Sequence, residues 1–249
     1  MLKAVFFDFD GTLVDDEDSI ANALAKACRV ACSRWPGLDA VAVAAAYRQI
    51  SETAWGDYDR FLRHLSSPEE MLAAVWSQTL ARWNFCDPTI EQEAADTYWQ
   101  HRLRTCQPCP DALPLLQCLA ERFHLSVLTN GAPTMQRAKL AATGLAPLFQ
   151  QIFVGGEFTR GKPDPLIFRA ALEKAGCQPN QAVHIGDSLT HDIAGARAVG
   201  IHSVWLNRKG LSLADLDRDG VMTPDFTITD LASLIECLEQ IGSHSLASK

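Results

Sequence analysis

The chain has 249 residues, of which 47% are hydrophobic, so it can bury a large core as one domain or two. Its net charge of −8 and pI near 5.3 argue against nucleic acid or an anionic membrane as a partner. Met1–Lys3 runs directly into a predicted strand and no apolar run reaches the ~18 residues of a membrane span, so we expect a cytoplasmic chain without a signal peptide.

The first predicted strand is followed at once by two aspartates. Ala4–Phe7 is an apolar run with the length of a buried strand, and Asp8, Asp10, Gly11 and Thr12 follow it. Because side chains alternate along a strand, Asp8 and Asp10 are expected on the same side. Ligands of open parallel sheets bind beyond the carboxyl ends of the strands. The same residue types also form ordinary turns, so the string alone leaves both interpretations open.

The next segment, residues 15–105, is predicted to be almost wholly helical. Helices are expected at residues 18–34, 40–50 and 57–65, then from Pro68, and from Pro88 to residue 104. Each of these two prolines follows a residue suited to cap a helix. We therefore expect a helical domain at residues 15–105, inserted into a core domain made of residues 1–14 and 106–249.

Beyond residue 108 the pattern alternates between strands and helices. Strands are expected at residues 124–128, 151–154, 182–185, 202–206 and 226–228, and helices at 110–122, 133–143, 165–175, 192–199 and 231–241. This regular alternation predicts an α/β fold, a doubly wound parallel sheet of Rossmann-like type with helices on both faces. The polar tail, residues 243–249, is expected to fray.

Three further polar strings lie at or beyond the ends of predicted strands. Thr129-Asn130-Gly131 offers a hydroxyl, an amide and backbone N–H groups to an anion. Lys162 lies in a proline-held loop and is a compact cation suited to a phosphoryl group. Asp187 ends another strand, and Asp192 follows it at the start of a predicted helix. Taken singly, each string is equally an ordinary turn or surface feature.

Because these strings lie at strand ends, we expect four carboxylates around one point, those of Asp8, Asp10 and Asp187 and, at the start of the following helix, Asp192. Carboxylates held so close repel each other unless some bind protons or a cation lies between them. Mg²⁺ prefers oxygen ligands and retains waters, which leaves positions for a substrate phosphate. The sequence therefore predicts a magnesium site.

The four strings read D-x-D-G-T, T-N, K-P and G-D-x-x-x-x-D, and in this order they resemble the motifs of the haloacid dehalogenase-like (HAD) superfamily of hydrolases. The resemblance covers nearly the whole chain, and the position of the helical segment between the first two motifs resembles a C1 cap. It implies a magnesium-dependent phosphatase that hydrolyses a small phosphomonoester through an aspartyl-phosphate.

The resemblance also implies a role for each motif residue. Asp8 resembles the nucleophile, and Asp10 the acid that protonates the leaving alcohol and then activates water. The phosphoryl group would be held by Lys162, which also orients Asp8, and by Thr129, Asn130 and Gly131. Magnesium would be held by the Asp8 carboxylate, the Asp10 carbonyl and Asp187, with Asp192 in support.

Several alternatives remain open on sequence alone. Dehalogenases of this superfamily share the fold but resemble D-x-Y-G-T at the first motif, and sugar phosphomutases share every motif found. A non-catalytic binding module is disfavoured because all catalytic positions are filled. The strings around Gly155 and Trp205 look closest to the branch with N-acylneuraminate-9-phosphatase and nucleotide phosphatases. The sequence pattern does not identify the substrate, and it does not distinguish a monomer from a homodimer. It also assigns no role to the residues of the helical segment that could reach the site: Arg48, Trp55, Asp57, Tyr58 and Arg60.

Overall fold

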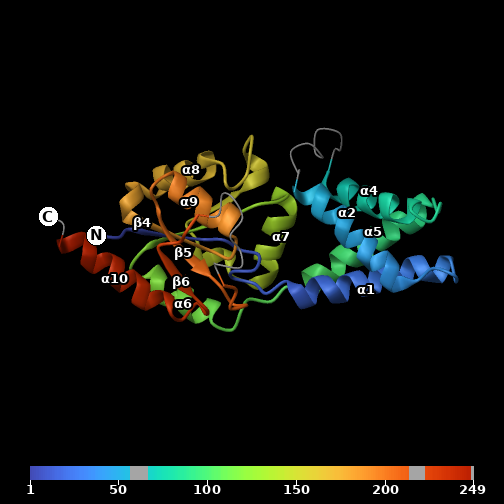
Figure 1. Cartoon of the computed structure of the whole chain (residues 1–249), viewed down its shortest axis with the longest axis horizontal. Helices are drawn as coiled ribbons and strands as arrows, with labels where there is room; N and C mark the ends of the chain where they lie inside the picture. The colour runs from blue at the N-terminus through green and yellow to red at the C-terminus, as the bar shows by residue number, and fades with distance from the viewer. Residues whose placement is uncertain (57–66, 213–221, 248–249) are drawn as a thin grey trace. The chain divides into compact units, whose positions relative to one another are not determined.

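The computed structural model describes residues 1–56, 67–212 and 222–247 (Figure 1). The chain divides into two compact units. The first comprises Met1–Asp15, Gln107–Gln136 and Thr143–Lys249, and the second comprises Asp16–Cys106 and Arg137–Ala142. The expectation that residues 15–105 form an inserted cap domain stays a prediction.

The first unit is built on a six-stranded sheet in which every neighbouring pair of strands is parallel. The strand order is β3-β2-β1-β4-β5-β6. The strands are β1 (Ala4–Phe7), β2 (His124–Thr129), β3 (Gln151–Val154), β4 (Ala182–Gly186), β5 (His202–Leu206) and β6 (Phe226–Ile228). The sequence order reverses at β1, which pairs with both β2 and β4, and ligands bind at such a switch point. The predicted doubly wound α/β fold is confirmed.

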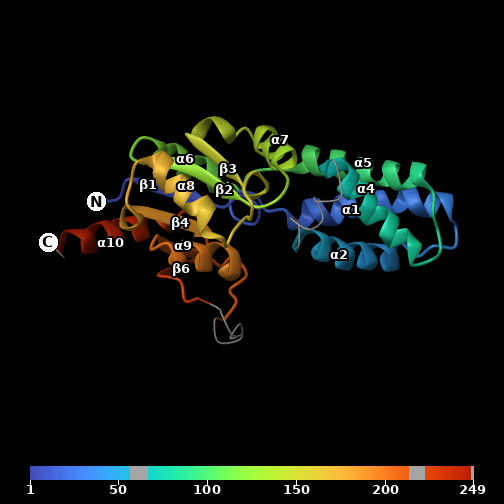
Figure 2. The same cartoon turned by 90° about the horizontal axis from the view of Figure 1, so that it is seen from above.

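Helices cover both faces of this sheet. In Figure 1, α8 (Pro165–Ala175) and α9 (Ala194–Ala198) lie on one side of the strands, and α6 (Ala112–Ala120) and α10 (Leu234–Ala247) lie on the other. The view from above in Figure 2 places α8 and α9 in front of the strands. The core under α8 joins fully buried side chains of β1, β2 and α8, among them Phe6, Leu128 and Phe168. Burial of these large side chains fixes the sheet and thereby the ends of its strands.

Two helix predictions in the first unit are wrong at their boundaries. The helix expected from Asp192 begins earlier, with a π-helical turn at Leu189–Ile193 that leads into α9. The last helix begins at Leu234 because Asp230 binds the backbone N–H of Ser233 in a preceding turn. It continues to Ala247, so the expectation of a frayed tail is wrong for residues 243–247, and residues 248–249 lie outside the described residues. The Ser243 hydroxyl donates to the Glu239 carbonyl and so does not interrupt the helix.

The second unit contains four described helices, α1 (Glu17–Arg34), α2 (Ala40–Gly56), α4 (Pro68–Ala81) and α5 (Pro88–Thr105). Ser67 and Asp87 cap α4 and α5 through backbone N–H groups of the first turn, as predicted. The helix expected at 40–50 extends to Gly56 because no helix breaker intervenes. The predicted helix at 57–65, with Asp57, Tyr58 and Arg60, lies outside the described residues.

The core of the second unit is aromatic. The Tyr47 ring lies 4.7 Å from Trp76 and 5.3 Å from Tyr98, measured between ring centroids. A buried ion cluster adjoins the start of α1, where Asp16 pairs with Arg102 at 2.6 Å and with Lys139 at 3.4 Å. Across both units, no helix within residues 1–56, 67–212 and 222–247 has the length and apolar character required to cross a membrane.

Candidate active site

The turn after β1 sets the position of Asp8. The Asp8 N–H donates to the Ile185 carbonyl at 2.8 Å and so extends the pairing of β1 with β4 by one residue. The chain then turns sharply, and Gly11 has φ +81°. A β-carbon at Gly11 would overlap the Asp187 carboxylate, so glycine is required there both for backbone conformation and for space.

Lys162 is the centre of the buried charges. Its Nζ donates to Asp8 Oδ1 and to Asp192 Oδ1, both at 2.6 Å, and the exposed fraction of the lysine side chain is 2%. Burial alone would lower the lysine pKa, but attraction to Asp192 and then to Asp8 outweighs it and raises the pKa. The ammonium therefore stays charged and binds the two carboxylates in one geometry.

The Asp192 carboxylate has three hydrogen-bond partners. Besides Lys162, the backbone N–H of Ser188 donates to its Oδ2 at 3.1 Å, and His184 Nε2 lies 2.9 Å from Oδ1. A carboxylate only accepts hydrogen bonds, so Nε2 carries the ring hydrogen. Burial would raise the pKa of Asp192, but Lys162 and His184 outweigh burial and lower it. The same burial lowers the pKa of His184, so its ring stays neutral.

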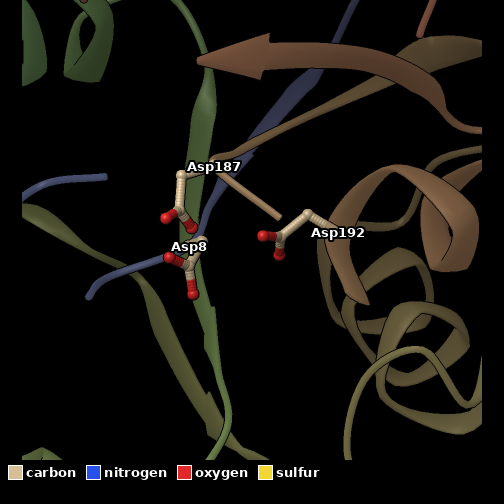
Figure 3. Close-up of side chains that lie close together, drawn as sticks. All are labelled: Asp8, Asp187 and Asp192. Atoms are coloured by element: carbon tan, nitrogen blue, oxygen red, sulfur yellow. The ribbon is translucent and has the colours of Figure 1, made fainter. Parts of the chain in front are cut away.

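The carboxylates of Asp8, Asp187 and Asp192 converge (Figure 3), and each offers an oxygen within 4.8 Å of the others. Burial and then repulsion from the neighbouring carboxylates raise the pKa of Asp8 well above its usual value, despite Lys162. Asp187 is exposed at the edge of the site, yet partial loss of water and then repulsion from Asp192 raise its pKa to about 6. This all-oxygen set with excess negative charge fits a hard divalent cation such as Mg²⁺.

The Asn130 side chain holds the backbone of Lys162. Its Oδ1 accepts from the Lys162 N–H at 2.7 Å, and its Nδ2 donates to the Lys162 carbonyl at 2.9 Å. Gly155 and Gly161 lie against this amide so closely that a β-carbon at either would overlap Asn130 Oδ1. The predicted phosphate-binding amide is thus engaged in positioning Lys162. Substrate binding by the backbone beside it, including Gly131, stays a prediction.

Asp10 and Thr129 are joined by a residue that the sequence did not single out. Gln136 Nε2 donates to Asp10 Oδ2 at 2.7 Å and to Thr129 Oγ1 at 2.6 Å. The group of converging carboxylates comprises Asp8, Asp187 and Asp192 and does not include the Asp10 carboxylate. The magnesium ligand predicted from Asp10 is its backbone carbonyl, and that role stays a prediction. Gln136 lies in the first turn of α7 (Pro133–Thr143), shortly after the T-N-G string. Its position next to that motif is the sequence signal that could have identified it. His184 was likewise missed, because a histidine within a buried strand carries no motif.

Curated relatives of the chain are phosphatases. It is 37% identical to a phosphoserine phosphatase of Thermus thermophilus, over 58% of this chain and 56% of that protein. It is 28% identical to a glyceraldehyde 3-phosphate phosphatase of Methanopyrus kandleri, over 97% of this chain and 99% of that protein. Human N-acylneuraminate-9-phosphatase is 26% identical over 84% of each chain, which agrees with the branch indicated by the sequence.

Solved structures share the fold. YfnB of Bacillus subtilis, a HAD-hydrolase with bound magnesium, has a TM-score of 0.71 at 24% identity and covers 95% of this chain and 98% of that one. A 2-haloacid dehalogenase of Pseudomonas syringae has a TM-score of 0.69 at 28% identity, with coverage of 96% and 99%. The family model of haloacid dehalogenase-like hydrolases matches residues 2–200. The chain therefore belongs to the haloacid dehalogenase-like hydrolase family.

Proposed function

We propose that the chain is a magnesium-dependent phosphatase that hydrolyses a small phosphomonoester through an aspartyl-phosphate on Asp8. The observation that carries this proposal is the position of Asp8, which accepts a hydrogen bond from Lys162 at the switch point of the sheet. Asp10 follows two residues later in the chain, and its carboxylate accepts a hydrogen bond from Gln136. A carboxylate attacks phosphorus, and phosphoryl transfer depends mainly on positioning and on neutralising charge. The ion pair of Asp8 with Lys162 and the converging carboxylates support both requirements.

In the first step, an Asp8 oxygen forms a bond to phosphorus and the ester P–O bond breaks. The Asp10 carboxyl gives its proton to the leaving oxygen, so the alcohol departs neutral. In the second step Asp10, now a carboxylate, takes a proton from water, which attacks phosphorus and releases Asp8 with inorganic phosphate. Lys162 and the Thr129 hydroxyl bind phosphoryl oxygens throughout. The negative charge of the transferring group thus meets a cation already fixed by Asp192.

The Asp8 and Asp187 carboxylates and the Asp10 carbonyl would hold Mg²⁺. Asp192 would support the site indirectly, through its ion pair with Lys162. The bound ion would neutralise charge on Asp8 and on the phosphoryl oxygens. The raised pKa values of Asp8 and Asp187 support this assignment, because burial and then repulsion between the carboxylates disfavour their charged forms, and a bound cation would reverse this.

We also propose that the helical segment, residues 15–105, is a cap that excludes water and contacts the leaving group. Support comes from its insertion between the first two motifs and its compact core around Tyr47 and Trp76. In this proposal the enzyme works in the cytoplasm as a monomer or homodimer. Its substrate is a small phosphorylated metabolite, with the relatives' substrates as the first candidates.

The test is a panel of phosphomonoesters assayed with Mg²⁺ and with a chelator. The panel comprises O-phosphoserine, glyceraldehyde 3-phosphate, a pyrimidine nucleotide and N-acylneuraminate 9-phosphate. We expect phosphate release that requires Mg²⁺ and is lost in Asp8→Asn. Beryllofluoride should form an adduct at Asp8 in the wild-type chain. Turnover that persists in Asp8→Asn, or halide release from a 2-haloacid without phosphate release from any ester, would contradict the proposal.

A further inference from the structure

Gln136 ties two parts of the site together. Its side-chain amide lies between the Asp10 carboxylate and the Thr129 hydroxyl, and the exposed fraction of the residue is 4%. We propose that Gln136 is a positioning residue that aims the acid group of Asp10 at the leaving oxygen of a phosphoryl group held by Thr129. This inference rests on the phosphatase mechanism proposed above.

The identity of the atom that faces Asp10 follows from donor and acceptor chemistry. An ionised carboxylate only accepts hydrogen bonds, so the amide must present its NH₂ group there. That nitrogen has two hydrogens, and the distances of 2.7 Å to Asp10 and 2.6 Å to Thr129 use both. Gln136 therefore fixes the separation between the acid and the phosphoryl-binding hydroxyl with one rigid planar group.

The bond to Thr129 also determines what the hydroxyl can do. Because Thr129 Oγ1 accepts from Gln136, its own hydrogen points away from Gln136, and the hydroxyl donates to the Asn130 carbonyl at 3.3 Å. A hydroxyl in this arrangement is a donor, which is the role that binding a phosphoryl oxygen requires. Gln136 thus sets the orientation of the Asp10 carboxyl through Oδ2 and leaves the Thr129 hydroxyl as a donor, and the first chemical step uses both.

Local structure keeps Gln136 in this place. Its N–H donates to the Ala132 carbonyl at 2.9 Å, in the first turn of α7, and helical side chains lean towards the N-terminus of their helix. The side chain therefore points back to the end of β2, where Thr129 lies. The turn between them uses Gly131 at φ +105°, a conformation that residues with a side chain rarely adopt.

The test uses substituted phenyl phosphates of similar size whose phenols differ in pKa. The value of kcat/KM reports phosphoryl transfer to Asp8, and protonation by Asp10 matters most when the leaving phenolate is basic. In Gln136→Met, which keeps the length of the side chain but removes both donors, we expect kcat/KM to fall about tenfold or more for the most basic phenolates. It should change little for the best leaving groups. The plot of log kcat/KM against phenol pKa should therefore be steeper than for the wild type.

Gln136→Glu is the second variant, because it has the same shape but sets an acceptor against the Asp10 carboxylate, and it should lose at least as much activity as Gln136→Met. Gln150→Met is the control, since Gln150 bonds the Leu125 N–H at the opposite end of β2. It should leave the plot unchanged. Equal losses for all leaving groups, or wild-type behaviour of Gln136→Glu, would overturn the role of Gln136 while leaving the phosphatase proposal intact. Absence of turnover by the wild-type chain would overturn both.

Discussion

Replacing Lys162 with Met should destabilise the protein strongly, because the lysine compensates two buried carboxylates. The variant keeps the length of the side chain but leaves Asp8 and Asp192 without their 2.6 Å ion pairs, and their exposed side-chain fractions are 8% and 2%. Removing one partner of a buried pair costs about 3–5 kcal/mol, well above the cost of a lost surface charge. We expect this loss in the free energy of unfolding, measured by urea denaturation at about pH 7.5 with a chelator.

The loss should depend on pH and on Mg²⁺. Asp8 and Asp187 have raised pKa values in the folded state, so the folded protein binds more protons than the unfolded chain, and protonation stabilises it as the pH falls. Lys162 lowers the pKa of both Asp8 and Asp192, so without it these carboxylates bind protons in the folded state at higher pH than in the wild type. The deficit of Lys162→Met should therefore shrink at about pH 5.5 and on addition of Mg²⁺. Lys174→Met, at an exposed lysine of α8, is the control and should change stability by less than about 0.5 kcal/mol. An equal deficit at both pH values would show that Lys162 acts through packing instead of charge.

Three further predictions concern the residues around Lys162. Asp8→Asn should lower kcat by about three orders of magnitude or more. Without metal the Tm of this variant should be no lower than that of the wild type, because burial, which raises the Asp8 pKa, makes a charged carboxylate unfavourable there. A marked fall in Tm, measured by calorimetry, would contradict this. Asp187→Ala should raise the Mg²⁺ concentration for half-maximal activity at least about tenfold, and an unchanged titration would remove Asp187 from the ligand set. Asn130→Ala should cost about 2 kcal/mol in urea denaturation, since two hydrogen bonds to Lys162 are lost, and should lower kcat through misplacement of the ammonium; Asn130→Asp, which keeps the acceptor, should lose less stability.

The motif residues were predictable because local sequence places them. Asp8, Thr129 and Asp187 each follow or end a run of strand-forming residues, and parallel strands present their carboxyl ends at one edge of a sheet. The bonds between these residues were not predictable. Asn130 lies 32 positions before the backbone that it holds, and Gln136 lies 126 positions after Asp10, so only the packing of α7 and of the Lys162 loop brings the partners together.

The boundaries that differed have local causes that periodicity does not record. The helix before α9 begins with a π-helical turn in which the Ser188 side chain accepts from the His191 N–H, and this moves its start ahead of Asp192. The α10 helix extends to Ala247, and the Ser243 hydroxyl within it donates to the Glu239 carbonyl one turn earlier instead of competing for a backbone N–H. In the first place a serine caps the turn, and in the second a serine is accommodated within the helix.

The buried ring of His184 has a spectroscopic consequence. One nitrogen carries hydrogen because Asp192 accepts it, while Nδ1 has no hydrogen-bond partner within the described ranges, and the Phe168 ring lies edge-on at 5.2 Å. The imidazole is thus held as a single tautomer in an aromatic ring-current field. Its nitrogen and ring-proton resonances should be sharp, should not titrate near neutral pH, and should shift when the charge on Asp192 is redistributed. An isotope-labelled histidine at this position would report the electrostatic state of the site from inside the sheet, without a probe that touches substrate.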